Sequence, residues 1–191
     1  MNNPNSSWTL FLDRDGVINT RLPGRYVKQW KDFEFTPNCL EAIAEFGKIF
    51  KTIVVVTNQQ GIGKGIMTKE ELEKIHDELR LKVKNAGGCI DQIYYSHKLK
   101  VHNPPCRKPN TGMAWQAKKE FPHIDFQKSI MVGDSFSDME FGWQLGMRTI
   151  FIEGKEEENE RTAKIPVDAR FKQLWHFAQY LKSPLVDFMI D

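Results

Sequence analysis

Residues 8–16 read WTLFLDRDG, a run of apolar and β-favouring residues that ends abruptly in two aspartates. The same arrangement recurs at residues 52–61, TIVVVTNQQG, and at residues 129–135, SIMVGDS. Runs without polar alternation are typical of the central strands of a parallel sheet, which are buried on both faces. The carboxyl ends of such strands meet at one edge of the sheet. We therefore expect the polar residues that follow the three runs to lie together at that edge.

Helical patterns separate and follow these strands. Residues 36–37, Thr-Pro, resemble an N-cap and a first-turn proline, while residues 68–71 match a capping box whose helix ends at Gly87-Gly88. Further helices are predicted over 113–121, 135–145 and 171–181, further strands over 90–96 and 148–153, and loops over 97–110 and 154–161. The alternation predicts a doubly wound α/β fold with a mainly parallel sheet, and the length predicts one domain over residues 1–191.

Composition and charge restrict the class of protein. Hydrophobic residues make up 40% and charged residues 27% of the chain, which is ordinary for a globular protein and excludes a disordered one. The longest apolar run, around residues 52–56, is too short to span a bilayer, and residues 1–8 lack the apolar core of a signal peptide. A net charge of +2 gives no basic footprint for nucleic acid. Three scattered cysteines, Cys39, Cys89 and Cys106, fit a reducing compartment, so we expect a cytoplasmic monomer.

The aspartates at the strand ends suit a divalent cation. Asp13 and Asp15 stand two residues apart, so in extended backbone both carboxylates face one side. Carboxylates that lie close together repel one another unless a cation lies between them, and Asp134 adds a third oxygen donor. We therefore expect Asp13, Asp15 and Asp134 to form a Mg²⁺ site. A carboxylate can also attack phosphorus as a nucleophile, while its neighbour acts as general acid and then base.

Hydroxyl and basic side chains complete a pattern suited to phosphate. Thr57 ends the second strand and can donate its hydroxyl to a phosphate oxygen, while Lys108 can neutralise charge as a compact cation. Arg107 can bind a second anionic group through its fork of N–H donors. Asp138 either favours a helix N-terminus or orients Lys108. Taken singly, Asp-x-Asp is a common turn and Arg107-Lys108 a solvated basic loop, but the ordered set favours a phosphate site.

Together these residues resemble the haloacid dehalogenase superfamily of phosphatases, over about residues 10–152. The four motifs of that superfamily stand here as Asp13-Arg14-Asp15-Gly16, Thr57-Asn58-Gln59, Lys108, and Gly133-Asp134 with Asp138. The resemblance implies that Asp13 is the nucleophile, that Asp15 is the general acid/base and that Mg²⁺ is required. It implies that Asp13, Asp134 and the main-chain carbonyl of Asp15 hold the metal. Thr57 and Lys108 would hold the transferring phosphoryl group.

Longer strings resemble one subgroup, which contains the D-glycero-D-manno-heptose 1,7-bisphosphate 7-phosphatases and the histidinol-phosphate phosphatases. These strings are LDRDGVIN at residues 12–19, TNQQGIGKG at 57–65 and CRKP at 106–109. The subgroup lacks a large cap domain and this chain leaves no room for one, so short loops would recognise the substrate. The resemblance implies removal of the 7-phosphate of the heptose through an aspartyl-phosphate. The candidate substrate-binding residues are Asn19, Asn58, Gln59, Gln60 and Arg107.

Three departures from the subgroup affect its implied cofactor and substrate. Many members carry a four-ligand zinc loop before Arg-Lys-Pro, whereas here Cys106 alone stands at a clear cysteine position, with His97 and His102 nearby. A closed zinc site needs four well-spaced ligands, so zinc is not expected. Ser135 stands where lysine is frequent in heptose phosphatases, and Lys64 stands where arginine is usual. Both changes weaken the assignment of the substrate.

Two other substrates and one other class of protein stay open as alternatives. Histidinol phosphate is a rival small substrate within the subgroup. The phosphatase domain of polynucleotide kinase-phosphatases, which removes 3′-phosphates from DNA, also resembles this chain at residues 57–59, 61–63, 107–109 and 111–113. The balanced charge argues against this alternative. A binding protein that had kept only the fold would be indicated by loss of Asp13 or Asp15, and both are present.

Overall fold

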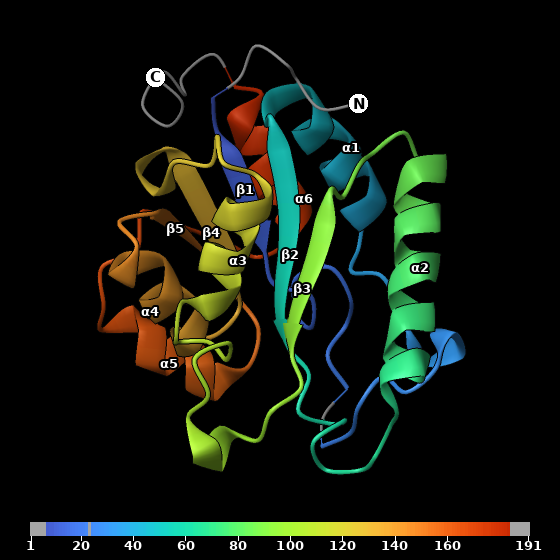
Figure 1. The fold of residues 1–191 in the computed structure, drawn as a ribbon. Coiled ribbons are helices and arrows are strands. Elements are labelled where there is room, and N and C mark those ends of the chain that lie inside the picture. Colours follow the sequence, from blue (N-terminus) through green and yellow to red (C-terminus); the bar gives the residue numbers. More distant parts are fainter. Residues whose placement is uncertain (1–6, 23, 184–191) are drawn as a thin grey trace.

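The computed structural model describes residues 7–22 and 24–183. Its centre is a six-stranded parallel sheet with the order β3-β2-β1-β4-β5-β6 (Figure 1). The chain adds strands first on one side of β1 and then on the other, which confirms the predicted doubly wound topology. The strands are β1 (Thr9–Leu12), β2 (Thr52–Asn58), β3 (Gln92–Ser96), β4 (Ser129–Gly133), β5 (Arg148–Ile152) and β6 (Ala169–Phe171).

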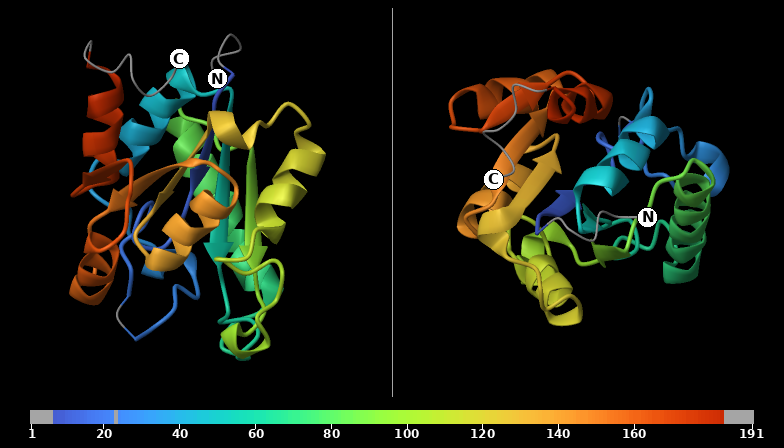
Figure 2. Two further views of the ribbon diagram at one scale, coloured as in Figure 1. Left: turned by 90° about the vertical axis from the view of Figure 1, so that its left-hand side faces the viewer. Right: turned by 90° about the horizontal axis from the view of Figure 1, so that it is seen from above.

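Helices cover both faces of the sheet (Figure 2). The helices are α1 (Cys39–Ile49), α2 (Lys69–Asn85), α3 (Gly112–Glu120), α4 (Phe136–Gln144), α5 (Glu156–Ala163) and α6 (Leu174–Leu181). Apolar side chains of α1, α2 and α6 join one core with the strands, while α3 and α4 join a second core on the opposite face. None of the described helices is both long and apolar enough to cross a membrane.

The start of α2 follows the prediction and the start of α1 does not. Glu71 N donates to Thr68 Oγ1 at 3.1 Å and Thr68 N donates to Glu71 Oε2 at 2.7 Å, which is the predicted capping box. The predicted N-cap at Thr36 is wrong, because α1 begins at Cys39 after Asn38, whose φ is +52°. The Thr36 hydroxyl instead donates to the carbonyl of Val17 and ties the segment after β1 to the loop before α1.

The prediction of a loop over residues 154–161 is wrong, because Glu156–Ala163 is the helix α5. Three glutamates occupy its first turn, where negative charge stabilises the positive end of the helix dipole. Strand β6 was not predicted, since its three residues are only half-buried and give no apolar run. Phe171 belongs to β6, so the closing helix α6 starts three residues later than expected.

Strand register brings the polar residues to one level at the carboxyl edge. Leu12, the last residue of β1, lies opposite Val55 of β2 and Val132 of β4. The residues that follow these partners therefore emerge side by side. This position, where the winding of the sheet reverses, is the usual crevice for a ligand in a doubly wound fold.

Candidate active site

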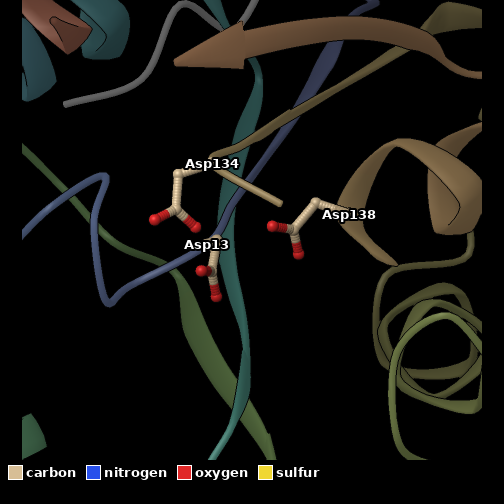
Figure 3. Close-up of side chains that lie close together, drawn as sticks. All are labelled: Asp13, Asp134 and Asp138. Carbon is tan, nitrogen blue, oxygen red and sulfur yellow. The ribbon is translucent and has the colours of Figure 1, made fainter. Parts of the chain in front are cut away.

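Three neighbouring strands deliver polar side chains to this crevice. Asp13 follows β1, Thr57 lies near the end of β2 and Asp134 follows β4, and each is at most 5% exposed. Figure 3 shows the carboxylates of Asp13, Asp134 and Asp138 directed toward one another. One carboxylate oxygen from each of the three lies within 4.8 Å of the others. The predicted meeting of strand-end residues is therefore present, with Asp138 of α4 added to it.

Lys108 neutralises two of these carboxylates. Its Nζ lies 2.7 Å from Asp13 Oδ1 and 2.6 Å from Asp138 Oδ1, and it also donates to the carbonyl of Val56. Burial alone would lower the pKa of Lys108, but Asp13 and Asp138 raise it above its ordinary value. The ammonium group is thus a permanent cation beside Asp13.

Asp138 takes both of the roles that were considered for it. Its Oδ2 accepts hydrogen bonds from the backbone N and the Oγ of Ser135, which closes a capping box at the start of α4. Its Oδ1 meets Lys108. The same carboxylate therefore fixes the helix and orients the lysine.

Asn58 fixes the backbone of Lys108 from the neighbouring strand. The Asn58 amide donates to the Lys108 carbonyl at 3.1 Å and accepts from the Lys108 N–H at 3.0 Å. This reciprocal pair explains how a loop residue keeps a defined position. Asn58, a predicted substrate-binding residue, also lines the cavity described below.

Three side chains clamp the carboxylate of Asp15. Arg14 Nη2 donates to both carboxylate oxygens at 2.9 and 3.0 Å, Asn19 Nδ2 donates to Oδ1 at 3.0 Å, and Gln59 Nε2 donates to Oδ2 at 2.6 Å. Burial would raise the pKa of Asp15, but Arg14 and these hydrogen bonds lower it below its ordinary value. Asn19 is fully buried behind Asp15 and away from the cavity wall, so we propose that it orients Asp15 and does not contact the substrate.

A histidine of α2 supports this clamp. His76 Nε2 lies 3.1 Å from Arg14 Nη1, and both side chains are almost completely buried. Burial and the neighbouring Arg14 lower the pKa of His76 well below its ordinary value. His76 is therefore neutral in the folded protein and accepts from the arginine.

The buried histidine predicts a loss of stability in acid. Below about pH 6.5 the unfolded chain binds a proton at His76 that the folded chain does not, so this residue lowers the free energy of unfolding by up to about 1.4 kcal/mol per pH unit. We expect His76→Gln to flatten the decline between about pH 7 and pH 5 in urea unfolding. The exposed His102 provides the control His102→Gln. Equal pH dependence in the wild type and in His76→Gln would contradict the prediction.

Arg21 marks the point where three oxygens converge. Its Nη2 donates to Asp134 Oδ1 at 2.6 Å and to the main-chain carbonyl of Asp15 at 2.8 Å, and lies 4.0 Å from Asp13 Oδ2. These are the three groups predicted to hold Mg²⁺, and here they surround one cationic atom. Burial raises the pKa values of Asp13 and Asp134, while Lys108 beside Asp13 and Arg21 beside Asp134 act in the opposite direction. Nearby positive charge therefore favours the ionised carboxylates.

Gly16 provides the room for this arrangement. A Cβ at position 16 would lie 1.9 Å from Asp134 Oδ2, and the φ of Gly16 is +101°, which other residues rarely adopt. A donor set of carboxylate and carbonyl oxygens around one point is what a hard cation such as Mg²⁺ prefers. The residues present therefore fit the predicted metal.

A cavity of about 530 Å³ opens above these groups. Its lining includes Thr57, Gln59 and Gln60 of the β2 edge. Basic side chains occupy much of its wall; they are Arg14, Arg21, Arg25, Lys64, Lys100, Arg107, Lys108 and Lys155. The charge of the whole chain is nearly balanced, so this concentration of cations is local and indicates an anionic ligand.

The loop before α3 contributes Arg107 but no evident metal cluster. Arg107 lines the cavity, and its Nη1 is buried with no hydrogen-bond partner among the residues that the structure describes. Cys106 Sγ lies 3.3 Å from Ser96 Oγ. Within residues 7–22 and 24–183, Asp13, Asp134 and Asp138 form the group of side chains able to share a metal. The expectation of no zinc stays a prediction.

Several site residues escaped the sequence reasoning. Arg14 was treated only as part of a motif, and His76 was not singled out. Lys155 and Glu158 were assigned to a solvated loop, yet both line the cavity, and Glu158 accepts from the backbone N of Phe136 at the start of α4. The run of three glutamates after Gly154 was the available signal, because acidic residues gather in the first turn of helices.

Comparison with known proteins places the chain in a family. The D-glycero-alpha-D-manno-heptose-1,7-bisphosphate 7-phosphatase of Mycobacterium tuberculosis is 34% identical over 171 residues, which cover 90% of each chain. A family model described as HAD-hydrolase-like matches residues 105–176. The chain belongs to the haloacid dehalogenase-like hydrolases. It is accordingly a phosphatase, a hydrolase that acts on phosphate monoesters.

Further relatives of this haloacid dehalogenase-like phosphatase support the same grouping. A D-glycero-beta-D-manno-heptose-1,7-bisphosphate 7-phosphatase of Photorhabdus laumondii is 32% identical, over 84% of this chain and 89% of the relative. The crystal structure of D,D-heptose 1,7-bisphosphate phosphatase from B. bronchiseptica, complexed with magnesium and phosphate, has a TM-score of 0.84 and 26% identity. That likeness covers 92% of this chain and 98% of the other.

Proposed function

We propose that this phosphatase is Mg²⁺-dependent and removes the 7-phosphate from D-glycero-D-manno-heptose 1,7-bisphosphate through an aspartyl-phosphate. The observation that carries the proposal is the place of Asp13, which is buried at the end of the central strand, beside Lys108, at the base of a basic cavity. The relatives named above act, by their names, on this sugar bisphosphate.

The chemistry follows from the two aspartates of residues 13–16. An oxygen of Asp13 attacks the phosphorus of the 7-phosphate, and the bond from phosphorus to the sugar oxygen breaks. Asp15 gives its proton to that sugar oxygen; the negative charge of a bound phosphate favours the protonated acid. Water then attacks the phosphorus of the aspartyl-phosphate while Asp15 takes its proton. The bond to Asp13 breaks, and inorganic phosphate and heptose 1-phosphate are the products.

The metal would be held by Asp13, Asp134 and the carbonyl of Asp15. When bound, Mg²⁺ supplies positive charge that offsets the negative charge of the phosphoryl group and of the carboxylates. Lys108 supplies a second, permanent charge at Oδ1 of Asp13. The Thr57 hydroxyl lies at the cavity wall, where it can donate to a phosphoryl oxygen.

The basic wall suits a substrate with a second phosphate. Lys64, Lys100 and Arg107 line the cavity and come from two loops away from the carboxylates. Arg107 presents a buried N–H group without a partner among the described residues, which a phosphate oxygen would satisfy. A volume of about 530 Å³ is within the usual range for a small-molecule site. These features favour a bisphosphorylated sugar over a monophosphate.

The test is phosphate release with Mg²⁺ from four substrates side by side: the α and β anomers of heptose 1,7-bisphosphate, histidinol phosphate and a 3′-phosphorylated oligonucleotide. We expect a heptose bisphosphate to have the highest kcat/KM, and the monophosphate product to be heptose 1-phosphate by NMR. Preference for histidinol phosphate or the oligonucleotide would overturn the proposed substrate. Activity without added Mg²⁺ after treatment with EDTA would overturn the metal requirement.

A further inference from the structure

Arg21 occupies the point shared by the three predicted metal ligands. Its atom Nη2 lies 2.6 Å from Asp134 Oδ1, 2.8 Å from the Asp15 carbonyl oxygen and 4.0 Å from Asp13 Oδ2. A single nitrogen therefore does for these oxygens what a compact cation would do. The side chains of Asp13 and Asp134 are buried, with 7% and 4% of their surface exposed, so water screens the attraction of a neighbouring cation only weakly.

The point between these three oxygens suits a compact cation better than it suits a guanidinium group. Arginine normally uses several N–H donors of its planar fork, but Arg21 reaches Asp134 and Asp15 through Nη2 alone. Its Nε is buried and has no hydrogen-bond partner within residues 7–22 and 24–183. A buried donor without a partner is costly. Two hydrogen bonds from a single nitrogen and the attraction of charge hold Arg21, and a cation that the oxygens can surround would replace both.

The position of Arg21 on a surface loop leaves space for its side chain to move away from the carboxylates. It lies on the loop between β1 and α1, its side chain is 35% exposed, and it lines the cavity together with Arg25. An arginine released from the carboxylates would stay at the wall of the cavity. The loop thus holds a positive charge that can be exchanged for another.

We propose that Arg21 is an internal counterion that competes with the divalent cation and thereby sets the cation concentration at which the enzyme is loaded. The proposal rests on the proposed metal site. In the metal-free protein Arg21 stabilises the buried carboxylates and keeps them gathered. It must leave Asp134 and the Asp15 carbonyl when the divalent cation binds, and this exchange weakens the apparent affinity for the cation.

The test is titration calorimetry of Mg²⁺, and of Mn²⁺ in parallel, into metal-free wild type and variants without substrate. Arg21→Gln is expected to bind each cation about tenfold more tightly, because the competing charge is gone. Arg25→Gln is the matched control: it removes the same charge from the same loop and cavity. We expect this control to shift the affinity by less than about twofold.

Thermal unfolding gives a second readout. Without metal, Arg21→Gln is expected to melt below the wild type, because the carboxylates lose their counterion, while added Mg²⁺ raises its melting temperature by more than it raises that of the wild type. Unchanged or weaker cation binding by Arg21→Gln would overturn the proposal. An equal rise in melting temperature with Mg²⁺ in Arg21→Gln and in the wild type would also overturn it. Asp134→Asn separates the two proposals, since it is expected to weaken cation binding whatever Arg21 does. Undiminished binding by Asp134→Asn would overturn the metal site itself.

Discussion

Asp13→Asn is expected to lower kcat by about 10⁴-fold or more, since an amide cannot attack phosphorus and form the aspartyl-phosphate. The fold is expected to persist. The amide has the same shape, its oxygen can still accept from Lys108, and Lys108 keeps its ion pair with Asp138. Steady-state phosphate release with heptose 1,7-bisphosphate measures the loss, and circular dichroism and urea unfolding check the fold.

The covalent intermediate provides the sharper readout for the same variant. Acid quenching during turnover, followed by mass spectrometry of peptides, should find phosphate on the peptide that holds Asp13 in the wild type and none in Asp13→Asn. Asp77→Asn is the control, because Asp77 is an exposed carboxylate of α2 that does not line the cavity. Substantial activity in Asp13→Asn, or phosphate trapped on another residue, would remove Asp13 as the nucleophile.

Lys108→Met is expected to lose both activity and stability. Lys108 is the buried cation between Asp13 and Asp138, and removal of one partner from a buried ionic group typically costs about 3–5 kcal/mol of unfolding free energy. Turnover should fall by about 10³-fold or more, because the phosphoryl group loses a buried positive charge. Lys119→Met, an exposed lysine of α3, is the control for loss of charge.

The loss of unfolding free energy in Lys108→Met is expected to depend on pH. Without Lys108 the pKa of Asp13 rises further, because burial and the neighbouring Asp138 raise it and Lys108 no longer lowers it. The folded chain then binds more protons than the unfolded chain between about pH 4 and pH 8. The defect should therefore be smaller near pH 5 than near pH 8 in urea unfolding. The double variant Lys108→Met/Asp138→Asn should regain part of the stability but none of the activity. A defect independent of pH, or a fully active Lys108→Met, would contradict this account.

Most strands and helices could be predicted from apolar runs and from the residues that begin and end helices. The unbroken run of residues 52–56 identified a central strand, and the capping box at Thr68 identified the start of α2. What escaped was local structure that depends on partners. Strand β6 is too short to show a pattern, and α5 is held by its contact with α4, through Glu158 at the backbone of Phe136.

In the candidate site, too, residues at strand ends and in motifs could be predicted, while residues placed by tertiary contacts could not. Asp13, Thr57, Lys108 and Asp134 were found because each has a fixed place at a strand end or in a motif. The clamp on Asp15 was not found, because it depends on tertiary contacts between residues remote in sequence, such as Arg14 with His76. Asn19 shows the limit of transferring a motif residue by residue. Its string suggested contact with substrate, while its full burial supports a role behind Asp15.

The central position of β1 in the sheet has a consequence for folding during translation. Residues 9–12 are translated before their partners, because they pair with β2 at Thr52 and with β4 at Ser129. The surroundings of Asp13, the proposed nucleophile, therefore cannot form until β4 has been translated. Contacts between such distant residues are slow to form, and the apolar residues of this strand stay unpaired meanwhile. The strand that leads to the proposed nucleophile is thus without its sheet partners for much of synthesis.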